Sequence, residues 1–94
     1  MRFLFHPEAE LFAAIDWYEA RSTGLGADFA AEIYATVQRA ASMPLAWPRI
    51  DGDVRRALAN RFPYGVLYAP RDESIYVLAV MHLSRYPAYW QNRM

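Results

Sequence analysis

Two apolar segments near the C-terminal end of the 94-residue chain constrain its fold more than any other feature. Residues 64–69 and 75–81 are rich in Val, Ile, Leu and Tyr, and the polar connector 70–74 separates them. Such runs are typical of strands, and a short polar connector is typical of a β-hairpin. The second run carries no charge on either face, so we expect it to be a central strand of a sheet covered on parts of both sides.

The first half of the chain predicts a short strand and a helix. Residues 2–6 alternate weakly and precede Pro7, a residue that suits the first turn of a helix. The predicted helix continues to about residue 21 because apolar side chains recur at helical spacing. These side chains are Leu11, Ile15 and Tyr18, with Phe12 beside them.

A second helix is predicted directly after the short connection 22–26, which contains Gly24 and Gly26. Its apolar residues lie four apart and extend it to about residue 42. They are Phe29, Ile33, Val37 and Ala41. Because the connection is so short, we expect the two helices to pack antiparallel as a helical hairpin.

The middle of the chain predicts a loop followed by a strand. Prolines at both ends exclude a helix over 43–48, and we expect Trp47 to pack against the edge of the core. Residues 51–53 read as a turn, and 54–61 alternate as a strand that presents Arg55 and Arg56 on opposite faces. The predicted order is βααβββ, an α+β fold with a helical hairpin on a small, mainly antiparallel sheet.

Composition limits the kinds of protein this can be. The length predicts one domain over 1–94, and three Trp, seven Tyr and five Phe are more rings than a small core hides, which predicts a binding surface. There is no Cys and no apolar run of about 18 residues. We therefore expect a cytoplasmic protein without a secretory signal or a membrane span. With two His and no ligand-spaced carboxylates, we expect no metal and no cofactor.

One group of side chains has the chemistry of a metal-independent nuclease. Arginines hold phosphate, while an imidazole or a phenol can transfer protons. The candidate catalytic residues, proposed to meet on one sheet face, are Arg56 (or Arg55), Arg61, His82, Arg85 and Tyr89. The alternatives are a solvated basic face for the arginines, a hydrogen-bonded strand-end residue for His82, and a tail in which Tyr89 and Trp90 pack on the core.

Short motifs along almost the whole chain resemble the RelE/ParE toxins of bacterial type II toxin-antitoxin modules. The motifs are His6-Pro7-Glu8-Ala9, Asp16-Trp17-Tyr18, Gly24-Leu25-Gly26 with Phe29, Pro44-Leu45-Ala46-Trp47-Pro48, Val54-Arg55-Arg56, Arg61-Phe62-Pro63-Tyr64, and His82-Leu83-Ser84-Arg85-Tyr86-Pro87-Ala88-Tyr89-Trp90 with Arg93. The resemblance implies a compact βααβββ fold, a cognate antitoxin that forms a hetero-oligomer with the toxin, and growth arrest by the free toxin.

The resemblance leaves two targets open: RelE-like members cut mRNA on the ribosome, and ParE-like members poison DNA gyrase. RelE-like nucleases have a basic strand segment, matched by Arg55 and Arg56, and a tail tyrosine, matched by Tyr89. They also carry an arginine after the tyrosine of the third-strand pattern, where this chain has Gly65. That departure and the formal net charge of zero favour gyrase over mRNA. A non-toxic module that only binds an antitoxin is the third alternative.

Overall fold

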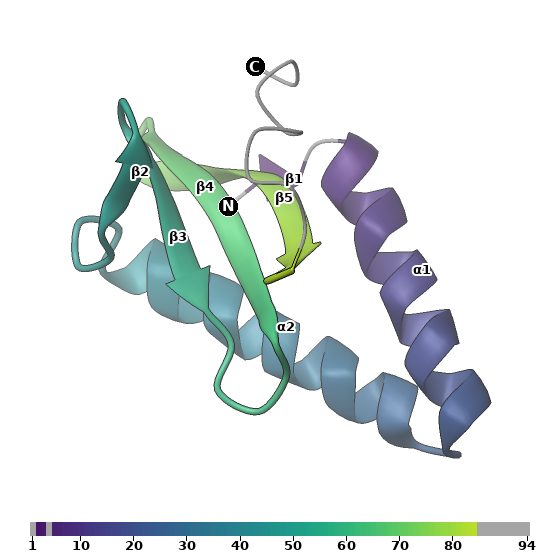
Figure 1. Cartoon of the computed structure of the whole chain (residues 1–94). Coiled ribbons are helices and arrows are strands. Elements are labelled where there is room, and N and C mark those ends of the chain that lie inside the picture. The colour runs from purple at the N-terminus through teal and green to yellow at the C-terminus, as the bar shows by residue number, and fades with distance from the viewer. Residues whose placement is uncertain (1, 4, 85–94) are drawn as a thin grey trace.

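The computed structural model describes residues 2–3 and 5–84 (Figure 1). The elements in chain order are β1 (Arg2–Phe3), α1 (Phe5–Arg21), α2 (Leu25–Ser42), β2 (Arg49–Asp51), β3 (Val54–Leu58), β4 (Tyr64–Arg71) and β5 (Ser74–His82). The strands form one sheet in the order β1-β5-β4-β3-β2. β1 pairs parallel with β5, and the other neighbours are antiparallel. The predicted α+β fold class is therefore confirmed.

Several elements differ from the predictions. β1 ends at Phe3 and α1 begins at Phe5, where a strand to residue 6 was predicted. β2 lies where a loop and a turn were predicted, because a three-residue strand with an irregular register is too short to show periodicity. β3 ends at Leu58 instead of residue 61, since the connection to β4 closes with a hydrogen bond from the Ala59 N–H to the Tyr64 carbonyl at 2.9 Å. β5 is an interior strand as expected, although β4 occupies the middle of the sheet.

The core lies between the helices and one face of the sheet. Phe29, Ile33 and Val37 of α2 are fully buried there, as their spacing predicts. On α1, by contrast, Leu11 and Ile15 are only partly buried. A second buried cluster lies on the opposite face of the sheet and contains Val54, Leu67, Ala69, Leu78, Ala79 and Met81.

An irregularity in β5 decides which side chains face the helices. Leu67 pairs with Ala79 and Tyr68 pairs with Val77, so Leu78 is an extra residue in β5. Such a bulge shifts the alternation of the side chains. Val77 and Val80 consequently both belong to the cluster on the helical face, whereas Leu78 and Ala79 belong to the other.

The connection between α1 and α2 depends on its two glycines and on Glu19. Gly24 has φ 88°, a left-handed conformation that favours glycine. A Cβ on Gly26 would lie 2.6 Å from the Ile15 carbonyl oxygen, so only glycine fits this approach. The Glu19 carboxylate accepts the N–H groups of Gly24 at 2.9 Å and of Gly26 at 3.0 Å, which satisfies donors at the start of α2.

The two helices diverge from this connection, with α2 running across the sheet and α1 standing beside β5 (Figure 1). α1 therefore meets the sheet mainly along one edge. Within the described residues, neither helix is both long and apolar enough to cross a membrane.

Candidate binding groove and the predicted catalytic residues

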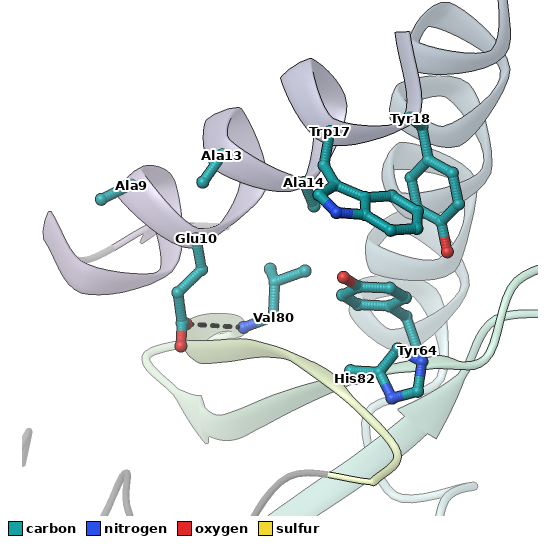
Figure 2. A pocket seen from close by; sticks show the side chains of 9 residues that line it. All are labelled: Ala9, Glu10, Ala13, Ala14, Trp17, Tyr18, Tyr64, Val80 and His82. Atoms are coloured by element: carbon teal, nitrogen blue, oxygen red, sulfur yellow. Dashed lines mark hydrogen bonds between the residues drawn. The ribbon is translucent and has the colours of Figure 1, made fainter. Parts of the chain in front are cut away.

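A groove of about 510 Å³ separates α1 from the sheet (Figure 2). α1 supplies one wall, and β4 and β5 supply the other. The lining residues are Ala9, Glu10, Ala13, Ala14, Trp17, Tyr18, Tyr64, Val80 and His82. Three of them are alanines, whose short side chains leave the space between helix and sheet unfilled.

The polar end of the groove is formed by Glu10. Its Oε1 accepts a hydrogen bond from the Val80 N–H at 3.1 Å (Figure 2). β1 pairs with β5 at Tyr76 and Val77, so at Val80 a carboxylate meets the strand edge in place of a neighbouring strand. Glu10 therefore links α1 to β5 and gives this end of the groove a negative charge.

The other end of the groove is aromatic. Trp17 is 51% exposed and packs edge-on against Tyr18, with ring centroids 5.0 Å apart. Across the groove, the rings of Tyr64 and His82 lie 5.2 Å apart, also edge to face. The Arg21 guanidinium carbon lies 3.6 Å from the Trp17 ring centroid, which shows that this indole already accepts a stacked cation.

His82 is held in place by contacts with Ser84. Nδ1 accepts the backbone N–H of Ser84 at 3.1 Å and lies 2.8 Å from the Ser84 hydroxyl. These contacts orient the imidazole ring at the end of β5. Burial raises the pKa of the nearby Tyr18 phenol, which therefore keeps its proton at neutral pH.

The structure does not place Arg56 and His82 on one face of the sheet, contrary to the expectation. Arg56 pairs with Leu67, whose side chain belongs to the cluster away from the helices, while His82 lines the groove beside α1. The Arg56 stem covers Gly65: a Cβ there would lie 3.1 Å from Arg56 Cγ and 3.2 Å from its Cδ. The bulge in β5 and the pleat together separate these two candidates.

The other candidate residues have different surroundings. Arg61 is exposed, lies 3.5 Å from an Asp28 carboxylate oxygen and sits over the Phe62 ring at 5.3 Å. Arg85 and Tyr89 lie outside the described residues, as does the predicted packing of Trp90. The catalytic roles of Arg56, Arg61, His82, Arg85 and Tyr89 remain predictions.

Arg55 supports the fold. Its Nη1 donates to the Trp47 carbonyl at 2.6 Å and to the Leu45 carbonyl at 3.2 Å, which holds the loop after α2 against β3. The buried Tyr68 hydroxyl donates to the Pro44 carbonyl of the same loop at 2.7 Å, and burial raises the pKa of this phenol. Trp47 packs against the core as predicted.

The groove residues Glu10, Trp17 and Tyr64 were not singled out by their chemistry in the sequence. The sequence does contain a pattern that indicates this wall of the groove: Ala9 and Ala13 lie one helical turn apart, and Trp17 follows at the same spacing. The groove forms only where this face of α1 lies opposite β4 and β5, which are distant from α1 in the sequence. Among the described residues, no cluster of three or more His, Cys, Asp or Glu side chains is placed to hold a metal ion.

Comparison with known proteins finds a similarity in structure. No family model matches the sequence, and no curated protein matches it significantly. Among solved structures, a chain of the "Chromosomal ParDE TA system from P. aeruginosa" superimposes with a TM-score of 0.72. The match covers 86% of this chain and 91% of that one at 17% sequence identity. The chain therefore has the fold of that ParDE structure, in agreement with the RelE/ParE resemblance of its sequence.

Proposed function

We propose that this protein is the toxin of a type II toxin-antitoxin module, that a cognate antitoxin neutralises it in a hetero-oligomer, and that it acts in the cytoplasm on DNA gyrase. The structural similarity to a chain of a ParDE system is the observation that carries the toxin assignment. The half-exposed Trp17 and the hollow beside α1 give an antitoxin segment a place to dock.

Gyrase is favoured over mRNA because the described residues do not gather the chemistry of a nuclease. Cleavage of RNA through its 2′-OH needs phosphate-binding cations close to a proton-transfer group. Here Arg56 and His82 lie on opposite faces, and Arg61 is next to Asp28. The zero net charge also gives little general attraction for RNA.

One observation favours the second candidate, a ribosome-dependent mRNA endonuclease. The Arg56 side chain lies across Gly65, the position at which the resemblance implies an arginine in nuclease members. An arginine reaching that surface from the neighbouring strand supplies a similar charge there.

The test begins with induced expression of the chain, with and without the product of the neighbouring gene. Growth arrest that the second protein relieves supports the module; normal growth with soluble protein leaves the non-toxic alternative. Purified protein is then added to gyrase supercoiling reactions and to translating ribosomes carrying a reporter mRNA. Loss of supercoiling or trapped cleaved DNA, with intact mRNA, is the expected result. If mRNA is cut and His82→Ala abolishes the cutting, gyrase is the wrong target.

A further inference from the structure

Arg56 combines partial burial with a charge that has no described partner. Arg55 donates hydrogen bonds to two loop carbonyls, and Arg61 lies 3.5 Å from an Asp28 carboxylate oxygen. The Arg56 side chain makes no hydrogen bond or ion pair with residues 2–3 or 5–84, although it is less exposed than Arg49, which also makes none. A guanidinium that is partly withdrawn from water is normally compensated by acceptors. Arg56 is therefore available to an anionic group of another molecule.

The surroundings of Arg56 are apolar and lie on the face of the sheet away from the helices. Its stem crosses Gly65, and a Cβ on that glycine would lie 3.5 Å from Leu83 Cδ2. Leu58 pairs with Gly65 and follows Arg56 by two residues, so its side chain shares this face. Leu58 is 40% and Leu83 44% exposed. We call Arg56, Leu58, Gly65 and Leu83 together the Arg56 patch.

The Arg56 patch is separate from the groove beside α1. Tyr64 and His82 line the groove (Figure 2), and each directly precedes a residue of the patch in the sequence. Because consecutive side chains along a strand point to opposite faces, the sheet lies between the groove and the patch. An antitoxin segment that docks beside α1 therefore leaves the patch to a different partner.

We propose that the Arg56 patch recognises the target protein, through a segment of the target that carries an Asp or Glu between apolar side chains. The inference rests on the proposed function, in which the target is gyrase, and names the surface and the chemistry of that contact. The two oxygens of a carboxylate match the guanidinium fork, while the apolar side chains of the segment cover Leu58 and Leu83. Exclusion of water by these contacts strengthens the ion pair.

A nucleic acid fits the Arg56 patch less well than an acidic protein segment does. Nucleic acids bind through several cations along the phosphate backbone and through aromatic rings on which bases stack. The patch instead has one cation and two aliphatic side chains. This composition favours a protein as its partner.

The first test compares Arg56→Gln with the wild-type chain in two affinity measurements, one with gyrase and one with the antitoxin. Glutamine keeps part of the apolar stem and removes the charge. We expect the affinity for gyrase to fall about tenfold or more, and the affinity for the antitoxin to change less than about twofold, which also shows that the variant is folded. The matched control Arg49→Gln removes an exposed arginine from β2 and should change both affinities less than about twofold.

A second pair of variants tests the patch without replacing Arg56. Leu83→Asp places a carboxylate next to the guanidinium, where it pairs with the cation and repels an acidic segment. We expect about tenfold more protein to be needed for half-inhibition of supercoiling. Leu45→Asp makes the same exchange at a leucine that is 70% exposed in the loop after α2, and it should leave the inhibition unchanged.

Three results would overturn the inference. Equal inhibition of gyrase by the wild type and by Arg56→Gln would show that the target does not use the patch. Loss of antitoxin affinity in Arg56→Gln, with gyrase affinity retained, would assign the patch to the antitoxin. Cutting of mRNA that requires Arg56 would assign it to RNA.

Failure of the inference and failure of the proposed function give different results with the wild-type chain. In the first two cases the wild type still inhibits gyrase, so the proposed function stands without this contact. A wild-type chain that binds the antitoxin but neither binds nor inhibits gyrase would reject gyrase as the target, and the inference with it.

Discussion

α1 and α2 have similar lengths and lie on the same face of the sheet, but they are packed to different degrees. The inward residues of α2, Phe29, Ile33 and Val37, are 0% exposed. α1 instead has apolar residues on both sides: Leu11 and Ile15 face the core, while Phe12 is 59% and Trp17 51% exposed. A helix that is apolar on both sides needs a second covering surface. The difference indicates that α2 completes the core and that α1 is available to a partner.

The side-chain hydrogen bonds between each helix and the sheet also differ between α1 and α2. Two side chains of α2 bind β3 and the connection after it: Glu32 accepts the Asn60 N–H at 2.7 Å, and Arg39 donates to the Leu58 carbonyl at 3.5 Å. On the α1 side, Glu10 accepts the Val80 N–H at 3.1 Å. The α2 side is therefore fixed at several points, whereas the α1 side leaves a groove.

Phe29→Ala should have the largest effect on stability. Its ring packs against Tyr18, Phe62 and Tyr64 at centroid distances of 4.8–5.2 Å. We expect the free energy of unfolding, measured with urea, to fall by about 3–5 kcal/mol. Phe12→Ala makes the same change at an exposed site on α1 and should cost less than about 1 kcal/mol. Equal costs would remove the distinction between the helices.

Trp17→Ala should affect binding more than stability. An exposed tryptophan at the rim of a groove has the properties of an interface hot spot, so we expect antitoxin affinity to fall by about 2 kcal/mol or more. The variant also loses the contact between the Trp17 ring and the Arg21 guanidinium, which should lower the free energy of unfolding by only about 0.5–1 kcal/mol. The control is Tyr34→Ala, which removes a ring of similar exposure, 52%, from α2. If Tyr34→Ala weakens binding as much, the partner does not distinguish the two helices.

Gly26→Ala tests the contact between α1 and α2. The new Cβ would meet the Ile15 carbonyl, and backbone cannot move aside as a side chain can. We expect a loss of about 1–3 kcal/mol, visible as a lower melting temperature. Gly65→Ala is the comparison, because its Cβ meets the flexible Arg56 stem and should cost less. The reverse order would show that the helices adjust to each other more easily than the close contact indicates.

Glu73→Gly should raise stability and so provide a background in which damaging α2 variants still fold. Asp72 and Glu73 connect β4 to β5 with φ values of 50° and 65°, which glycine tolerates better than other residues. We expect a gain of about 1 kcal/mol in urea unfolding. Glu73→Ala removes the same charge but keeps a Cβ, and it should give no such gain. A similar gain from both variants would mean that charge, not backbone conformation, limits this turn.

The ion pair of Asp53 with Arg71 should have the smallest effect, because it lies at the exposed end of the sheet away from both helices. Its hydrogen bond with Arg71 lowers the pKa of Asp53. A lowered folded-state pKa contributes stability above the unfolded-state value and loses it as pH falls through the folded-state value. Asp53→Asn should therefore lower the melting temperature slightly at pH 7 and not at about pH 2. A difference that is independent of pH would contradict this assignment.

Local patterns were sufficient to predict much of the fold. The spacing of Phe29, Ile33 and Val37 predicts α2, and the two apolar runs predict β4 and β5, because these elements bury continuous stripes. β2 was missed because three exposed residues carry no such stripe. The relative positions of Arg56 and His82 were predicted incorrectly because they depend on Leu78, a bulge that no turn residue or glycine marks in the sequence. The groove was missed for a similar reason, since helix and strands define it only together.

Amide hydrogen exchange with and without the antitoxin tests most directly whether α1 is the partner surface. The account predicts slower exchange in the complex for residues 10–18 of α1 and 78–82 of β5. It predicts little change for residues 29–40 of α2, which are already protected by the core. Protection that is confined to the outer side of α2 or to β2, with residues 10–18 unchanged, would contradict it.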